Sequence, residues 1–176
     1  MREQTAVVSE AAARERASLA VLYDRSAPGA VRLAYLLTGD RMLAEDIAQD
    51  AFVRVAGQLA HLRDAGAFDA YLRRAVVNLA KNHFRRRAVE RAFLDRARPN
   101  DRTPGHEQPV VDRRATMTAL AKLPQRQRAA IVLRFYEDLS EDEIARILRC
   151  RNGTVRSLVT RGVHAMRSEL RGDPDA

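Results

Sequence analysis

Apolar residues recur along almost the whole chain at the three- and four-residue spacing of an α-helix, and period-two alternation is nearly absent. The clearest stripe has members four residues apart and consists of Leu43, Ile47, Ala51, Val55 and Leu59. The pattern predicts helices over 10–25, 29–37, 42–59, 67–98, 112–122, 125–136, 140–148 and 152–171. The sequence therefore predicts an all-α fold.

Three interruptions set the expected boundaries in the first half of the chain. Pro28 and Gly29 should separate the first two helices, because proline lacks a backbone donor and glycine is flexible. The segment 37–40, Leu-Thr-Gly-Asp, should close the second helix, and 61–66 should form a short loop.

The composition changes at 98–110, which contains three prolines and a glycine and has a single apolar residue at its end. Such a segment cannot bury a core, so a flexible linker is expected there. We expect two small helical domains, at 10–97 and 112–171, joined by a flexible linker at 98–111. No internal repeat is visible.

The chain is basic, with 31 Lys and Arg against 23 Asp and Glu and a formal net charge of +8. Nearly all the positive charge is arginine, which favours a polyanionic partner, although a GC-rich genome would explain the same excess. Cys150 is the single cysteine, so no internal disulfide can form and a reducing compartment is expected. No signal peptide and no run of about 20 apolar residues is present, which predicts a cytoplasmic protein without membrane contact.

The charge is segregated along the chain. Residues 71–98 carry nine basic and two acidic side chains, and 149–171 carry six basic and one acidic. Residues 40–59 instead carry four acidic side chains against two basic ones. Two basic helices indicate two contacts with nucleic acid, and the acidic helix indicates a different, basic partner.

The C-terminal part has the pattern of a helix-turn-helix. Ser140 is the expected cap of one helix, with Glu143 in the capping-box position, and Asn152 is a second cap candidate after a short turn. On a wheel of about 100° per residue, Val155 and the other apolar residues of the second helix share one face. The opposite face has Arg156, Ser157, Thr160, Arg161 and His164. These donors suit major-groove base edges and phosphates, whereas the alternative is an ordinary amphipathic helix with a solvated basic face.

The long helix of the first half divides in the same way. One face has Phe68, Leu72, Ala75, Val76, Leu79 and His83, and the other has Tyr71, Arg74, Asn78, Lys81, Asn82 and Arg85. Cations for phosphate, amides for base edges and a ring for stacking together suit unpaired DNA bases. For this helix taken alone, an ordinary surface face that contacts only solvent is the alternative to a DNA-binding face.

Catalytic and metal chemistry find no support in the sequence. We find no nucleophile–base pair, no metal-ligand spacing among the histidines and no phosphate-cradling glycine loop, so no enzyme activity, cofactor or metal is expected. Cys150 is expected to be a small packing residue, and His164 to be solvated or to face phosphate.

Taken together, these segments resemble a known family. The segments 34–40 (AYLLTGD) and 44–52 (AEDIAQDAF) are similar to the polymerase-binding region of extracytoplasmic-function sigma factors, and 70–82 (AYLRRAVVNLAKN) resembles their minus-10 helix. The segments 120–124 (LAKLP), 136–140 (YEDLS) and 153–157 (GTVRS), with Arg126 and Arg128, resemble their minus-35 domain. The resemblance covers about 17–171 and is greatest for the actinobacterial SigE-like subfamily.

The resemblance implies a transcription initiation factor that binds core RNA polymerase and promoter DNA and promotes DNA melting. It assigns docking on the clamp helices of the largest polymerase subunit to Asp46, Gln49, Asp50 and Val53. It assigns the minus-10 element to His61, Arg63, Tyr71, Arg74, Asn78, Lys81, Asn82 and Arg85. It assigns the minus-35 element to Thr154, Arg156, Ser157, Thr160 and Arg161. The polymerase flap and an anti-sigma factor are further partners that the family allows.

Two positions depart from the family pattern. Leu158 stands where many members have arginine, and Ala56 where tryptophan is common, so one DNA contact and one aromatic docking contact are expected to be missing. The main alternative function is a helix-turn-helix regulator that binds duplex DNA without polymerase. A response regulator would need a βα receiver half, which 1–97 does not predict, and an adaptor that binds only protein would not need the exposed arginines and asparagines.

Overall fold

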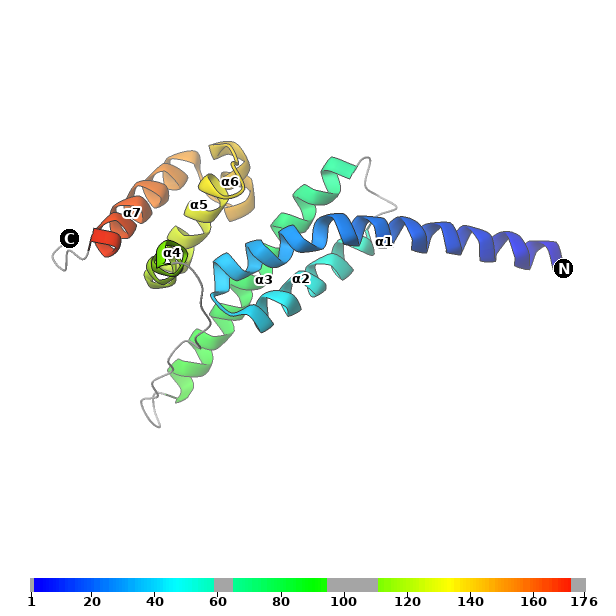
Figure 1. Ribbon diagram of the computed structural model, residues 1–176, viewed down its shortest axis with the longest axis horizontal. Coiled ribbons are helices and arrows are strands. Elements are labelled where there is room, and N and C mark those ends of the chain that lie inside the picture. Colours follow the sequence, from blue (N-terminus) through cyan, green and yellow to red (C-terminus); the bar gives the residue numbers. More distant parts are fainter. Residues whose placement is uncertain (1, 59–64, 95–110, 172–176) are drawn as a thin grey trace.

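The computed structural model describes residues 2–58, 65–94 and 111–171, and within these ranges it contains seven helices and no strand. They are α1 (Arg2–Thr38), α2 (Arg41–Ala56), α3 (Ala65–Leu94), α4 (Val111–Lys122), α5 (Gln125–Phe135), α6 (Glu141–Leu148) and α7 (Asn152–Arg171). Helices α1 to α3 form the first domain and α4 to α7 the second (Figure 1). The predicted all-α fold with two small helical domains is confirmed. None of the described helices has the length and apolar character needed to cross a membrane.

Helix α1 ends at Thr38 and helix α2 begins at Arg41, so the two helices are joined by a tight turn at Gly39 and Asp40. Gly39 has φ of +72°, in the left-handed region that favours glycine, and its N–H donates to the Tyr35 carbonyl oxygen at 2.7 Å. Asp40 then caps α2, its side chain accepting from the Leu43 N–H at 3.1 Å. The predicted close of a helix at this point is confirmed. The tight turn places α2 back along α1, and α3 packs against both of them.

The predicted break at Pro28 is wrong. Helix α1 continues through Pro28 and Gly29, and its N-terminal part extends beyond the other helices (Figure 1). A proline inside a helix costs about 3 kcal/mol, because one hydrogen bond is lost and the ring crowds the preceding turn. Contacts on both sides offset this cost. Before the proline, the buried Ser26 donates to Asp69 of α3 at 2.8 Å; after it, Ala30 is buried in the core.

The remaining boundaries lie close to those predicted. Helix α3 begins at Ala65, inside the expected loop 61–66, and is described as far as Leu94; its predicted end at 98 lies outside the described residues. Helix α4 begins at Val111, the last residue assigned to the linker. Most of the expected linker, and the segment 59–64, lie outside the described residues.

The second domain is built around α5. Ala129 to Leu133 are all buried, so this helix packs on every side; α6 and α7 of its own domain and α1 of the first domain contact it, and α4 packs against α7. Helix α7 packs closely on α5 at Gly162, where an added Cβ would lie 2.7 Å from Ile131 Cγ1. Glycine at this position therefore sets how closely the two helices pack.

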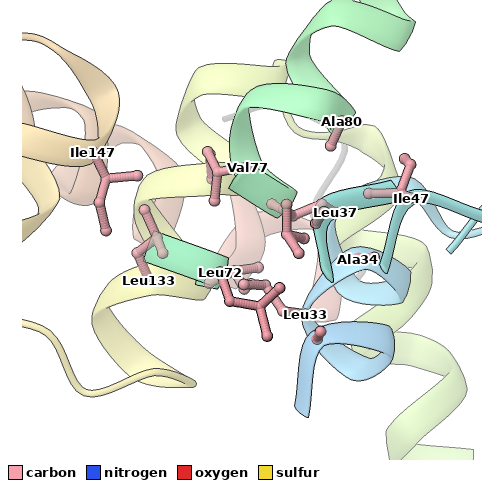
Figure 2. Close-up of a cluster of buried hydrophobic side chains, with 14 of the residues drawn as sticks. Leu33, Ala34, Leu37, Ile47, Leu72, Val77, Ala80, Leu133 and Ile147 are labelled. Atoms are coloured by element: carbon pink, nitrogen blue, oxygen red, sulfur yellow. The ribbon is translucent and has the colours of Figure 1, made fainter. Parts of the chain in front are cut away.

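The two domains share one hydrophobic cluster (Figure 2). Leu37 of α1 and Val77 of α3 belong to it together with Leu133 of α5 and Ile147 of α6. Val77 and Ala80, which the helical wheel did not assign to the core face of α3, are 4% and 2% exposed. Their burial shows that α3 has a second apolar face, which the second domain covers.

Candidate nucleic-acid and polymerase interfaces

Helices α6 and α7 form the predicted helix-turn-helix, and the start of α6 is held by a full capping box. The Ser140 N–H and Oγ donate to the Glu143 carboxylate at 2.9 and 2.7 Å, and Ser140 Oγ accepts from the Glu143 N–H at 3.4 Å. The hydrogen bonds from Ser140 lower the pKa of the Glu143 carboxyl, which keeps the cap ionised at neutral pH. The predicted cap is confirmed.

The turn between the two helices is made without glycine. Arg149 ends α6 in the left-handed conformation, with φ of 52°, and the Cys150 N–H donates to the Ala145 carbonyl oxygen at 3.0 Å. A non-glycine residue in this conformation costs about 1–2 kcal/mol, and the sequence carries no signal for it. Cys150 is half-buried against the core, as expected for a packing residue.

Helix α7 spans Asn152–Arg171, as predicted, so Asn152 is its first residue and not the cap that precedes it. The first helical hydrogen bonds are accepted by the carbonyl of Arg151, and the Asn152 amide donates to Asp142 of α6. This contact ties the beginning of the second helix to the beginning of the first. The orientation of α7 in the motif is therefore fixed at its N-terminal end.

The outer face of α7 presents the residues expected to read the minus-35 element. Thr154, Arg156, Thr160 and Arg161 are exposed, and Ser157 is half-buried. The Arg156 side chain is 71% exposed, and its Nε donates to Glu141 at 2.7 Å. Arg161 donates through Nε and Nη2 to Ser157 Oγ, at 3.1 and 2.6 Å. The inner face is anchored by Val155, which is fully buried. The predicted division into two faces is confirmed, except that Leu170 is 49% exposed.

The residues expected at the minus-10 element lie along α3 with unequal accessibility. Tyr71, Lys81 and Arg85 are exposed, whereas Arg74, Asn78 and Asn82 are half-buried. His61 and Arg63 lie outside the described residues. The opposite face carries the core residues Phe68, Leu72 and Val76, as the helical wheel predicted.

The residues expected to bind polymerase share one exposed face of α2. Asp46, Gln49 and Asp50 are exposed, and Val53 is an apolar side chain with 64% exposure. Ile47, Ala51 and Val55 are buried on the other face, which confirms the predicted stripe at these three positions; Leu43 is half-buried, and Leu59 lies outside the described residues. The outer face of α2 is thus acidic with an apolar residue at one end.

Arg128 joins the two domains, and sequence reasoning did not identify this role. Its residue is only 8% exposed, and Nη1 donates to the Leu37 carbonyl oxygen of α1 at 2.9 Å. Nη2 donates to the carbonyl oxygens of Ala121 and Leu123, and the guanidinium lies 5.9 Å from the centre of the Phe84 ring. Burial lowers the pKa of Arg128, although an arginine remains protonated at neutral pH. No local pattern distinguishes this arginine from the many surface ones.

The contact between domains also covers part of α3. Arg73 forms an ion pair of 2.7 Å with Glu137 of the second domain, with side-chain exposures of 27% and 16%. A cavity of about 30 Å³, room for about two waters, lies between the domains. Its polar lining includes Asn78 and Lys81 from α3, and Gln125, Arg126 and Arg149 from the second domain. Two of the residues expected at the minus-10 element therefore face the second domain in this arrangement.

Among the described residues, no group of three or more histidine, cysteine, aspartate or glutamate side chains is placed to hold a metal ion. The chemistry that the surfaces offer is ionic and hydrogen-bonding.

The comparisons with known proteins agree with this arrangement. Residues 22–90 match the family Sigma-70 region 2, and residues 113–166 match the family Sigma-70, region 4. The RNA polymerase sigma-E factor of Streptomyces antibioticus is 34% identical over 137 residues, which cover 76% of this chain and 74% of that protein. The ECF RNA polymerase sigma factor SigL of Mycobacterium tuberculosis is 34% identical over 169 residues, 93% of this chain and 94% of that protein.

Solved structures share the fold. The sigma factor RpoE from Bartonella quintana, in complex with the anti-sigma factor NepR, has a TM-score of 0.71 at 24% identity, covering 86% of this chain and 95% of that chain. CnrH, in complex with the cytosolic domain of CnrY, has a TM-score of 0.63 at 22% identity, covering 94% and 95%. The relatives and the two matched domains identify the chain as a member of the extracytoplasmic-function sigma factors of RNA polymerase.

Proposed function

We propose that this chain binds core RNA polymerase through α2, grips the minus-10 element through α3 and the segment before it, and reads the minus-35 element through α7. The observation that carries the proposal is that surfaces of opposite charge lie on different helices. The exposed face of α2 is acidic, whereas the exposed faces of α3 and α7 are basic. An acidic face suits a basic protein partner, and the basic faces suit nucleic acid.

The proposed residue roles are those that the family resemblance implies, and the exposure and chemistry of the described residues support them. Asp46, Gln49, Asp50 and Val53 would dock on the polymerase clamp helices. Thr154, Arg156, Ser157, Thr160 and Arg161 would contact the minus-35 duplex. His61, Arg63, Tyr71, Arg74, Asn78, Lys81, Asn82 and Arg85 would hold unpaired bases and phosphates at the minus-10 element. Asn78 and Lys81 line the cavity between the domains, which implies that the second domain moves away from α3 when these two residues bind DNA.

Further assignments rest on the relatives. They are named as RNA polymerase sigma factors, so we propose a cytoplasmic location and no catalytic activity of the chain's own. The flap of polymerase and an anti-sigma factor are proposed as further partners; RpoE of Bartonella quintana was solved with one. The domain boundaries 10–97 and 112–171, with a linker at 98–111, also remain a proposal.

Reconstituted transcription tests the proposal. Purified core polymerase and the chain should together give run-off transcripts from a subset of a genomic promoter library, and neither component should do so alone. Reversing the charge of Asp46 and Asp50 to Lys should sharply reduce co-purification with core polymerase, since like charges facing the basic clamp cost several kcal/mol.

The matched control is Asp24→Lys with Glu90→Lys, which makes the same change of charge at two exposed acidic residues on α1 and α3, outside the docking face of α2. It should leave polymerase binding nearly unchanged, and both variants should keep the helical circular dichroism. Equal association of the double reversal and the control would contradict the assignment of α2. Tight binding of promoter duplex without any polymerase-dependent transcription would favour the helix-turn-helix regulator instead.

A further inference from the structure

Glu141, in the first turn of α6, contacts the arginine expected to read the minus-35 element. Its Oε2 accepts a hydrogen bond from Arg156 Nε at 2.7 Å, between residues 15 apart in sequence and on different helices of the motif. The Glu141 side chain is 37% exposed, so the pair lies at the surface where α6 and α7 meet.

The main chain that carries Glu141 is held firmly relative to α7. The capping box of Ser140 and Glu143 fixes the first turn of α6, and Asp142 accepts from Asn152 at the start of α7. The buried Ile144 anchors the same helix in the core. Glu141 therefore offers its carboxylate from a fixed place, even though its side chain is partly solvated.

The hydrogen bond engages one nitrogen of the guanidinium, and the other two have no hydrogen-bond partner among the residues that the structure describes. An arginine in water samples many rotamers, and that freedom is lost when it makes a bidentate contact with a base. With Nε held by Glu141, the two terminal NH2 groups remain as an outward fork that can donate to two acceptors on a guanine edge. The Arg156 side chain therefore samples fewer rotamers in the free protein than an unrestrained arginine would.

We propose that Glu141 is a positioning residue for Arg156 and thereby sets base discrimination at the minus-35 element. The proposal rests on the proposed function of Arg156. Exposed ion pairs are weak, so removal of the carboxylate should reduce discrimination by about two- to fivefold. The same carboxylate repels DNA phosphates, so its removal should leave affinity for unrelated duplex unchanged or increase it. A residue needed only for folding would instead weaken both kinds of binding together.

The experiment uses the full chain in complex with core polymerase and a duplex library randomised across the minus-35 element, with the bound fraction sequenced. Arg156→Ala first identifies the base position that Arg156 reads. Glu141→Ala should lower discrimination at that same position and leave the others unchanged. Glu141→Gln, which keeps an acceptor oxygen, should recover part of the loss.

Two controls separate positioning from charge and from folding. Asp142→Asn removes one negative charge at the neighbouring residue while keeping an acceptor for Asn152, and it should not alter discrimination at the position read by Arg156. In an Arg156→Ala background, Glu141→Ala should have no further effect on discrimination. Thermal unfolding checks that each variant is folded, and Glu141→Gln provides a second test where the alanine variant is not.

The outcomes distinguish failure of the positioning role of Glu141 from failure of the proposed function of Arg156. If Arg156→Ala loses discrimination and both Glu141 variants do not, the positioning role is overturned and the proposed function stands. If Arg156→Ala itself leaves discrimination unchanged at every position, the proposed role of Arg156 fails and the role of Glu141 fails with it. Loss of discrimination in the Arg156→Ala background would show that Glu141 acts by another route, which also overturns the proposal.

Discussion

Gly162→Ala should destabilise the second domain, although it places a better helix former in the middle of a helix. The substituted Cβ would lie 2.7 Å from Ile131 Cγ1 and 3.1 Å from Ile131 Cδ1. Carbon atoms in contact prefer about 3.5–4.0 Å, so α7 has to move away from α5 by several tenths of an ångström or more. The Ile131 side chain is buried and has little room to yield.

The magnitude follows from two opposing effects. Replacing a helical glycine by alanine stabilises by about 1 kcal/mol, whereas overpacking a core contact costs about 1–3 kcal/mol. We therefore expect a net loss of up to about 2 kcal/mol. Gly29→Ala is the matched control: Gly29 is also inside a helix, but a Cβ there meets nothing within 4 Å. That variant should gain about 0.5–1 kcal/mol.

Urea unfolding followed by circular dichroism measures both variants, and minus-35 duplex binding reports whether α7 has been displaced. Ile131→Ala removes the two carbons that the new Cβ would meet. The double variant should therefore be less destabilised than the two single losses predict, with a coupling of about 1 kcal/mol. A Gly162→Ala protein as stabilised as Gly29→Ala would refute the argument that close packing requires this glycine.

Two further predictions concern α3. Asn78→Ala with Asn82→Ala should leave polymerase binding intact but impair open-complex formation, as measured by permanganate footprinting; a template with a pre-melted bubble should restore part of the activity, because unpairing no longer has to be driven. If the double variant opens linear promoter DNA like the wild type, these residues are structural. The pKa of His83 is lowered by burial and by Arg87, against weaker opposing effects of Asp40 and Glu90, and its Nε2 has no hydrogen-bond partner among the described residues. The unfolded chain therefore takes up a proton near pH 6.5 and the folded chain only at lower pH, so unfolding free energy should fall as the pH drops from about 7 through 6.5. His83→Gln should flatten that decrease in pH-dependent urea titrations; an unchanged slope would contradict it.

The features predicted correctly are those that local sequence determines. The capping box of Ser140 and Glu143 depends on residues three apart, and the buried stripe of α2 depends on one helical period. The division of α7 into a buried and an exposed face follows from the same periodicity. These features require no knowledge of how the helices pack together.

The features that sequence reasoning missed depend on contacts between distant segments. Pro28 normally ends a helix, and only the packing of α1 on α3 reveals that it does not. Val77 and Ala80 lie beside polar residues on α3, and Arg128 is one arginine among many. All three are buried where the two domains meet. The segment that joins the domains has no helical pattern, so no periodicity could indicate this contact.

The cavity between the domains has a consequence for DNA affinity. If Asn78 and Lys81 hold the minus-10 strand as proposed, the second domain is an intramolecular competitor for the same surface of α3. Because the competitor is covalently attached, diluting the protein does not weaken it. The apparent affinity for the strand is then the intrinsic affinity multiplied by the fraction of molecules in which the domains are apart. Every 1.4 kcal/mol of free energy that holds the domains together lowers this fraction, and therefore the apparent affinity, about tenfold. A partner that binds only the separated form, without touching DNA, would raise that affinity by the same factor, and the bound strand would in turn tighten the partner.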